Sequence, residues 1–195
     1  MKYRFKRAET EQEFAEIARL NHAVFAAELG QYPTRPEDAL IDKFHEKNTY
    51  LIALNGEKLA GMIAVHFEAP FSVAQKLADP SVLDRLGRIA EIRLLAVDPA
   101  YRKGVVVAGL FWFVVDYSRD CDTLVISGRL EELKMYQNLG FHSLGPAVAS
   151  GSAMFVPMAA AIPECRKIAE PWDRKFMPGS SPAGRSGSGG PVAAA

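Results

Sequence analysis

The chain has 195 residues, and its 23 basic and 23 acidic side chains give a formal net charge of zero. This balance argues against a nucleic-acid binder that works mainly by electrostatics. The apolar fraction of 49% argues against global disorder and suits one globular domain with a short appendage. A small metabolite or a carrier protein is therefore the partner that we expect.

The N-terminal stretch "MKYRFKRAETEQEF" is charged and lacks the apolar run of a signal peptide. No segment of the sequence is long and apolar enough to span a bilayer. The two cysteines, Cys121 and Cys165, make neither a disulfide framework nor a metal-ligand spacing, and the four histidines are scattered. We therefore expect a cytoplasmic protein with reduced thiols, no metal site and no membrane span.

The first part of the chain predicts a strand, a helix and a hairpin. Thr10 and Glu13 form a capping box at the start of the helix, and Asn55 with Gly56 forms a hairpin turn between two β-rich runs. In order, we expect a strand at 3–8, a helix from Thr10 to near Gly30, a polar loop with a short helix at 31–48, and strands at 49–54 and 58–68.

The second part alternates helices and strands. Ser81 is expected to cap a short helix, Gly140 to close a longer one, and Pro163 to begin the last one. In order, we expect one or two short helices within 69–88, a central strand at 89–97, a helix from about Gly104 to Ser118, a strand at 123–127, a helix at 130–139, and strands at 141–145 and 152–158.

This order of elements predicts the α/β (α+β) class, with one mixed sheet and helices on both of its faces. We divide the chain into a domain at 1–160, a C-terminal helical extension at 161–177 and a tail at 178–195. The small-residue, low-complexity composition of the tail predicts a disordered segment or a linker.

The segment "DPAYRKGVVVAGL" joins the central strand to the helix that follows. The free backbone N–H groups and the dipole at a helix N-terminus favour an anion there, and Arg102 and Lys103 add positive charge. The branched side chains of Val105, Val106 and Val107 narrow the approach to the backbone. The segment therefore predicts a phosphate site in which the phosphate approaches the backbone less closely than it does in a glycine-rich loop.

Together with the later "MYQNLGF", the segment "LAVDPAYRKG" resembles the GNAT superfamily of N-acyltransferases, and the element order agrees from Tyr3 to about Met158. The resemblance implies a mostly antiparallel sheet with a splayed central parallel strand pair. It also implies a loop that binds the pyrophosphate of acyl-CoA, such as acetyl-CoA. The residues that it places at this co-substrate are Leu95, Ala96, Val97, Arg102, Lys103, Gly104, Val105, Val106 and Ala108.

The resemblance also implies catalytic roles, since aminolysis of a thioester needs a neutral amine, a stabilised oxyanion and a protonated leaving thiolate. A bulge around Leu95–Val97 would turn backbone amides toward the thioester. The Tyr136 hydroxyl would donate to the departing sulfur, and Glu91 would deprotonate the amine through water. The structural alternatives are that Tyr136 only packs against the sheet and that Glu91 pairs with Arg93 on one strand face.

The stretches "VFAAELGQYP" and "DKFHEKNTYLIAL" are similar to the acyl-homoserine-lactone and long-chain N-acyl amino acid synthases. Those enzymes take acyl chains from acyl carrier protein, so the phosphopantetheine arm of that carrier is the alternative donor. The expected acceptor is an amine of a small molecule or a peptide. A further alternative is a non-catalytic GNAT-fold accessory or sensor domain of a larger protein, and the oligomeric state stays open.

Overall fold

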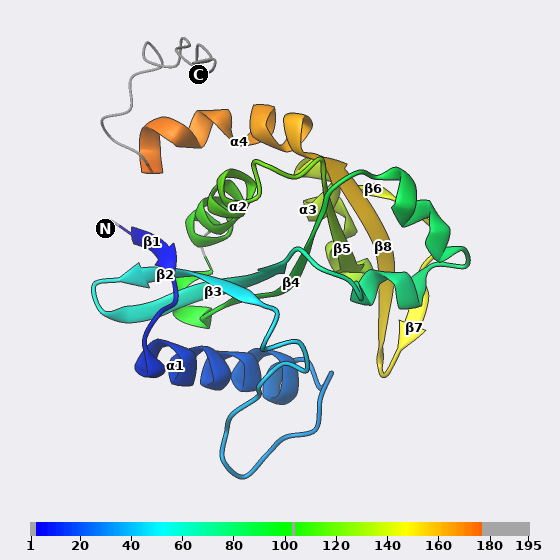
Figure 1. The fold of residues 1–195 in the computed structure, drawn as a ribbon. Helices are drawn as coiled ribbons and strands as arrows, with labels where there is room; N and C mark the ends of the chain where they lie inside the picture. Colours follow the sequence, from blue (N-terminus) through cyan, green and yellow to red (C-terminus); the bar gives the residue numbers. More distant parts are fainter. Residues whose placement is uncertain (1–2, 103, 177–195) are drawn as a thin grey trace, which may run out of the picture.

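A computed structural model describes residues 3–102 and 104–176 of the chain (Figure 1). Lys103 and the predicted tail at 178–195 lie outside the described residues. None of the described helices has the length and apolar character that crossing a membrane requires.

Within the described residues, eight strands form one sheet in the order β1-β2-β3-β4-β5-β8-β6, with β7 also paired to β8. All neighbouring strands run antiparallel except β4 and β5, which run parallel. The mixed, mostly antiparallel sheet confirms the predicted fold class. The strands are β1 (Tyr3–Arg7), β2 (Thr49–Asn55), β3 (Lys58–His66), β4 (Ile89–Val97), β5 (Thr123–Arg129), β6 (His142–Ser143), β7 (Val148–Ser150) and β8 (Ala153–Ala161).

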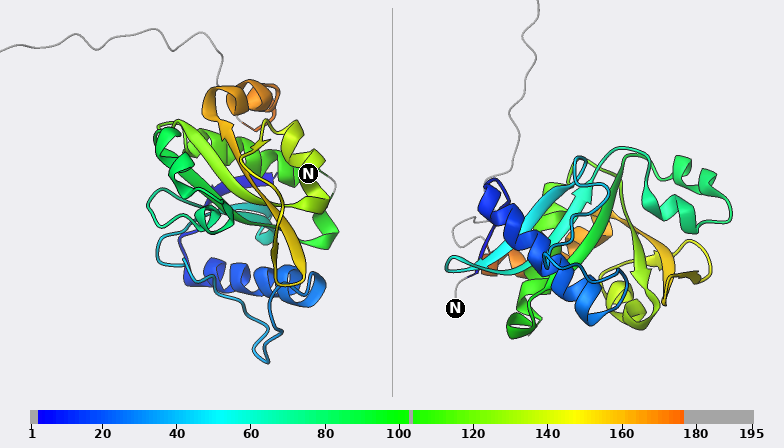
Figure 2. Two further views of the ribbon diagram at one scale, coloured as in Figure 1. Left: turned by 90° about the vertical axis from the view of Figure 1, so that its right-hand side faces the viewer. Right: turned by 90° about the horizontal axis from the view of Figure 1, so that it is seen from below.

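Helices cover both faces of this sheet, as predicted (Figures 1 and 2). On one face lies α1 (Glu11–Asn21), which continues as the π-helix η1 (His22–Glu28). On the other lie α2 (Val105–Tyr117) and the C-terminal α4 (Ile162–Phe176), which pack against each other. The remaining helical segments are η2 (Ser72–Lys76), η3 (Pro80–Arg85), η4 (Pro99–Tyr101), η5 (Leu130–Glu132) and α3 (Leu133–Asn138).

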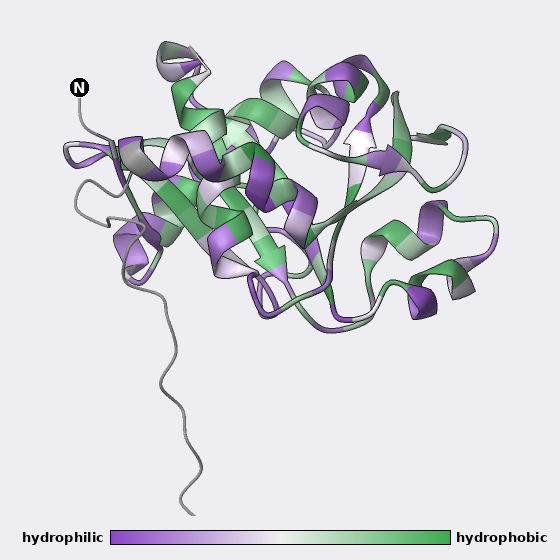
Figure 3. Cartoon of the chain, turned by 90° about the horizontal axis from the view of Figure 1, so that it is seen from above, coloured by the Kyte–Doolittle hydropathy of each residue, from purple (hydrophilic) through white to green (hydrophobic). Residues whose placement is uncertain are grey.

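The period of two along the strands divides the core between the two faces. Leu51 and Ala53 of β2 belong to the apolar cluster under α2, while Ile52 and Leu54 belong to the cluster under α1. All four side chains are buried. The central strands are accordingly largely hydrophobic, whereas the helices carry residues of both kinds (Figure 3).

The local signals at the first helix and the hairpin are confirmed. The Thr10 side chain accepts a hydrogen bond from the Glu13 amide at 3.2 Å, and the Glu13 carboxylate accepts one from the Thr10 amide at 3.1 Å. The helical run ends at Glu28, just before Gly30, whose φ is 59°. The turn between β2 and β3 falls at Gly56 and Glu57, next to Asn55.

Three local predictions were wrong. Segment 31–48 contains turns but no helix, because buried Asp42 accepts hydrogen bonds from the Phe44 amide and the Asn48 side chain and holds the loop in another shape. The cap of η3 is Asp79 rather than Ser81, since the Asp79 carboxylate accepts from the Ser81 amide at 3.0 Å. The predicted pair of final strands is joined by a third, β7, which pairs with β8.

The parallel pair β4–β5 is splayed, as the GNAT resemblance implies. Pairing covers only Ile89–Glu91 against Thr123–Val125, and the strands diverge beyond that point. On its other side, β4 has a bulge against β3, since Met62 pairs with Ala96 and Ala64 pairs with Arg93. Leu94, inside the bulge, has a φ of 49°. The bulge thus begins at Leu94, one residue before the position expected from the sequence.

Candidate active site

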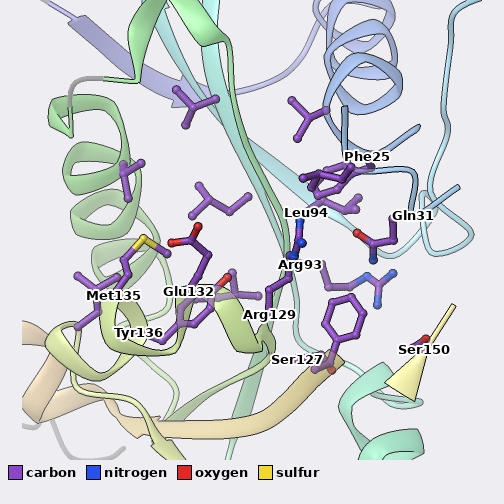
Figure 4. A pocket seen from close by; sticks show the side chains of 18 of the residues that line it. Phe25, Gln31, Arg93, Leu94, Ser127, Arg129, Glu132, Met135, Tyr136 and Ser150 are labelled. Atoms are coloured by element: carbon purple, nitrogen blue, oxygen red, sulfur yellow. The ribbon is translucent and has the colours of Figure 1, made fainter. Parts of the chain in front are cut away.

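A cavity of about 1000 Å³ lies where β4 and β5 diverge (Figure 4). Side chains from both splayed strands line it, and η1, the start of α2, α3, η2, β7, β8 and the loop after η1 also contribute to the wall. The residues labelled in Figure 4 are Phe25, Gln31, Arg93, Leu94, Ser127, Arg129, Glu132, Met135, Tyr136 and Ser150. The cavity opens because the two parallel neighbours separate beyond Glu91 and Val125, where their pairing ends.

Tyr136 reaches this cavity from α3. Its ring lies against Gly128 of β5, where a Cβ would come within 2.8 Å of two ring carbons, so only glycine allows this approach. Burial and the charge of Glu132 raise the pKa of the Tyr136 phenol, against an opposing backbone hydrogen bond with Arg129. The hydroxyl therefore keeps its proton over the neutral range and can donate it.

Arg102 also lines the cavity, but its guanidinium is occupied. Its Nη1 and Nη2 atoms donate to the two carboxylate oxygens of Glu28, each at 2.6 Å, and its Nε donates to the Val97 carbonyl at 3.0 Å. The hydrogen bond from Arg102 is also the main reason why the pKa of Glu28 is lowered. The predicted phosphate-binding arginine thus ties η1 to the loop after β4.

Of the other residues predicted at the co-substrate, some line the cavity and others do not. Leu95, Val97, Gly104 and Ala108 line the cavity together with Arg102, as does Val107, which the prediction left out. Ala96 and Val106 are buried in the core instead, and Val105 does not line the cavity. Gly104 is the N-cap of α2 with a φ of 82°, a conformation that favours glycine, and no side chain of the described residues caps the helix.

Glu91 is fully buried and does not line this cavity. Its carboxylate accepts hydrogen bonds from the Ser72 amide at 2.7 Å, the Ser72 hydroxyl at 2.8 Å and the Val73 amide at 2.7 Å. His66 Nε2 lies 2.8 Å from Glu91 Oε2. Burial acts to raise the pKa of Glu91, but the donors from His66, Ser72 and Val73 outweigh it and lower the pKa. Glu91 thereby anchors η2 to the sheet.

The expected structural alternative for Glu91, a pair with Arg93, does not form. Arg93 Nη2 donates instead to Asp42 at 2.8 Å, and its Nη1 donates to the Ser72 hydroxyl. Asp42 and Glu28 were missed by sequence reasoning, since both come from helices or loops far from the motifs. The only sign of them in the sequence was that each is an acidic residue in a stretch that resembles the acyl-homoserine-lactone synthases.

Comparisons with known proteins agree with this architecture. The chain is similar to the solved structure of FeeM, an N-acyl amino acid synthase from uncultured soil microbes, with 21% identity and a TM-score of 0.69 over 85% of this chain and 94% of that one. The acyl-homoserine lactone synthase LasI gives 17% identity and a TM-score of 0.68 over 86% and 93%. BjaI, a CoA-dependent acyl-homoserine lactone synthase solved with SAM and isopentyl-CoA, gives 17% and 0.64 over 83% and 81%.

No curated protein sequence matches the chain. The model of one protein family, described as N-acyl amino acid synthase FeeM, matches residues 16–160, which is well over half of the chain. That range contains the splayed strand pair, the loop with Arg102 and the helix with Tyr136. The chain therefore belongs to the FeeM family of N-acyl amino acid synthases and is an acyltransferase.

Proposed function

We propose that this enzyme transfers an acyl group from the thioester of a phosphopantetheine arm to the α-amine of an amino acid. The observation that carries the proposal is the cavity between the splayed strands β4 and β5, which has a protonated tyrosine in its wall. Membership of the N-acyl amino acid synthase family supports the same reaction and the amino acid acceptor. Reduced thiols and thioester donors fit a cytoplasmic enzyme.

The reaction follows from how the cavity wall is built. The amine nitrogen attacks the thioester carbonyl carbon, and backbone N–H groups at the Leu94–Leu95 bulge stabilise the oxyanion that forms. The carbon–sulfur bond then breaks, and the Tyr136 hydroxyl gives its proton to the leaving thiolate. The proton lost by the amine restores the phenol through solvent, so the products are an amide and a free thiol.

For Glu91 we propose a positioning role. Its two oxygens already accept three hydrogen bonds and contact His66, and it lies outside the cavity. Ser72 lines the cavity and donates to this carboxylate, so this serine links Glu91 to the cavity wall. Glu91 acts on the reaction by fixing the wall of the cavity rather than by taking a proton.

The arm can come from acyl-CoA, our default donor, or from acyl carrier protein. The function is tested by incubating the enzyme with acyl-CoAs of increasing chain length, or with acyl carrier protein loaded with the same chains, and a mixture of amino acids. We expect a new N-acyl amino acid by mass spectrometry and one free thiol for each amide formed. If neither donor yields an amide, the proposal fails.

The ion pair between Arg102 and Glu28 allows a prediction about the affinity for CoA. Glu28→Gln should strengthen CoA binding about three- to tenfold, because it releases guanidinium donors that can then bind the diphosphate. The measurement is a calorimetric titration of CoA at two salt concentrations. The matched control is Glu57→Gln, at the exposed β2–β3 turn.

The same titration separates the two donors. In a carrier-borne arm the phosphate stays on the serine of the carrier, so Glu28→Gln would have little effect, and Arg102→Met would weaken the docking of an acidic carrier in a salt-dependent way. If Glu28→Gln leaves CoA affinity unchanged while CoA still binds, Arg102 has no part in holding the diphosphate.

A further inference from the structure

Three cationic side chains gather in one part of the cavity, away from the tyrosine and the helix N-terminus. Lys43, Lys76 and Arg93 all line the cavity. Lys43 and Arg93 both lie over the ring of Phe44, at 5.1 and 4.5 Å from its centroid, and Lys76 lies 4.9 Å from the centroid of Phe155. Aromatic rings rather than carboxylates therefore support the two lysines.

The carboxylate next to Arg93, that of Asp42, already has hydrogen-bond donors at both of its oxygens. The Asp42 carboxylate accepts from Arg93 at both oxygens, and also from Asn48 and the Phe44 amide. Within residues 3–102 and 104–176, no ion pair includes either Lys43 or Lys76. Three cations thus face one saturated carboxylate, which leaves an excess of positive charge in a partly apolar cavity.

The three cations lie close enough together to repel one another. Burial, followed by the positive charges of Lys43 and Arg93, lowers the pKa of the Lys76 ammonium. A bound anion would relieve this repulsion. The arrangement is therefore complementary to a negatively charged group of a ligand rather than to a neutral one.

The alternation of β8 places this group on the face of the sheet away from the donor side. Val156 and Met158 belong to the apolar cluster that includes α2 and Tyr136. Phe155 precedes Val156, so its side chain and the Lys76 ammonium above it lie on the opposite face. The cavity passes between the splayed strands, with the N-terminus of α2 and Tyr136 on one side and the cations on the other. An anion held by these cations would therefore not be the phosphate of an arm that enters beside α2.

We propose that Lys43 and Lys76, beside the fixed charge of Arg93, bind the carboxylate of the amino acid acceptor. The proposal rests on the proposed function and adds the residues that select the acceptor. One carbon atom separates the α-amine of an amino acid from its carboxylate. Holding the carboxylate at the lysines therefore directs the amine toward the splay, where the thioester carbonyl lies. Arg93 acts as a positioning residue, since Asp42 and Ser72 hold its guanidinium in place.

The test compares an amino acid with its primary amide, which keeps the amine and loses the negative charge. The wild type should have a kcat/KM for the acid about ten- to a hundredfold above that for the amide, which is the range of one or two charge-assisted hydrogen bonds. In Lys43→Met/Lys76→Met this preference should disappear through a higher KM for the acid. The KM for the donor and the kcat/KM for the amide should stay unchanged.

The controls keep folding and function apart from the subsite. Lys58→Met removes an exposed lysine at the β2–β3 turn and should keep the preference for the acid. Lys76→Arg retains the positive charge at this position and should keep most of the preference, and thermal melting should show that all variants are folded. If the double variant acylates amino acids as selectively as the wild type, the lysine subsite is disproved while the proposed function stands. If the wild type acylates other amines but no amino acid, both proposals fail.

Discussion

Replacing Tyr136 with phenylalanine should lower kcat about a hundredfold or more, which is the usual effect of losing a group that transfers a proton in the transition state. The ring would keep its contact with Gly128 and its edge-on packing against Phe141, so the fold and the affinity for the donor should change little. Single-turnover measurements of thiol release, together with donor titrations, check both statements.

Tyr117 provides the matched control for this variant. It lies at the end of α2, 36% exposed and outside the cavity, so Tyr117→Phe should leave kcat unchanged. If the rate of the Tyr136 variant is also unchanged, the tyrosine only packs against β5 and another group or water protonates the leaving sulfur. A donor with a more acidic leaving thiol should narrow the gap between wild type and Tyr136→Phe, because its thiolate needs the proton less.

Replacing Glu91 with glutamine should lower the free energy of unfolding by about 3 kcal/mol, since removing one partner of a buried charged network leaves the others unsatisfied. The glutamine side chain has the same shape, but its NH2 group would replace one carboxylate oxygen and face the backbone N–H donor there, that of Ser72 or that of Val73. Chemical denaturation at neutral pH measures the loss. Glu57→Gln at the exposed turn is the control and should lie within about 0.5 kcal/mol of wild type.

The Glu91 network also predicts a pH dependence. The pKa of Glu91 is lowered in the folded state from its ordinary value of 4.5, so the carboxylate stabilises the fold fully above that value. This contribution is lost as the pH falls below 4.5 and through the folded pKa. The stability of Glu91→Gln should therefore fall less steeply in this acidic range than that of the wild type, with equal slopes counting against the network.

Because Glu91 anchors η2, the variant should also affect the acceptor more than the donor. Lys76 is the last residue of η2 and lies in the cavity wall. A loosened η2 should raise the KM for the amino acid severalfold and leave the pH profile of kcat unchanged. Loss of an ionisable step from that profile would return Glu91 to the role of proton acceptor.

The sequence alone determined the order of most elements and the family resemblance. The capping box of Thr10 and Glu13, the hairpin turn that follows Asn55, and the motif around Tyr136 act within a few residues, so short-range periodicity and capping chemistry suffice to predict them. The splayed parallel pair followed from the family resemblance, since strand separation has no signature of its own in a single strand.

Only the tertiary structure decided which charges meet in the cavity. Arg102 was expected to face phosphate, yet Glu28, 74 positions earlier in the chain, occupies it. Glu91 was expected near the substrate, yet Ser72 and Val73 enclose it. Lys43 and Lys76 had no recognisable pattern, because the path of the loop with Lys43 depends on buried Asp42 and the position of η2 with Lys76 depends on buried Glu91. Hydrophobic periodicity predicts which face of an element is buried, but the pairing of polar side chains across long sequence separations depends on how the packed elements bring them together.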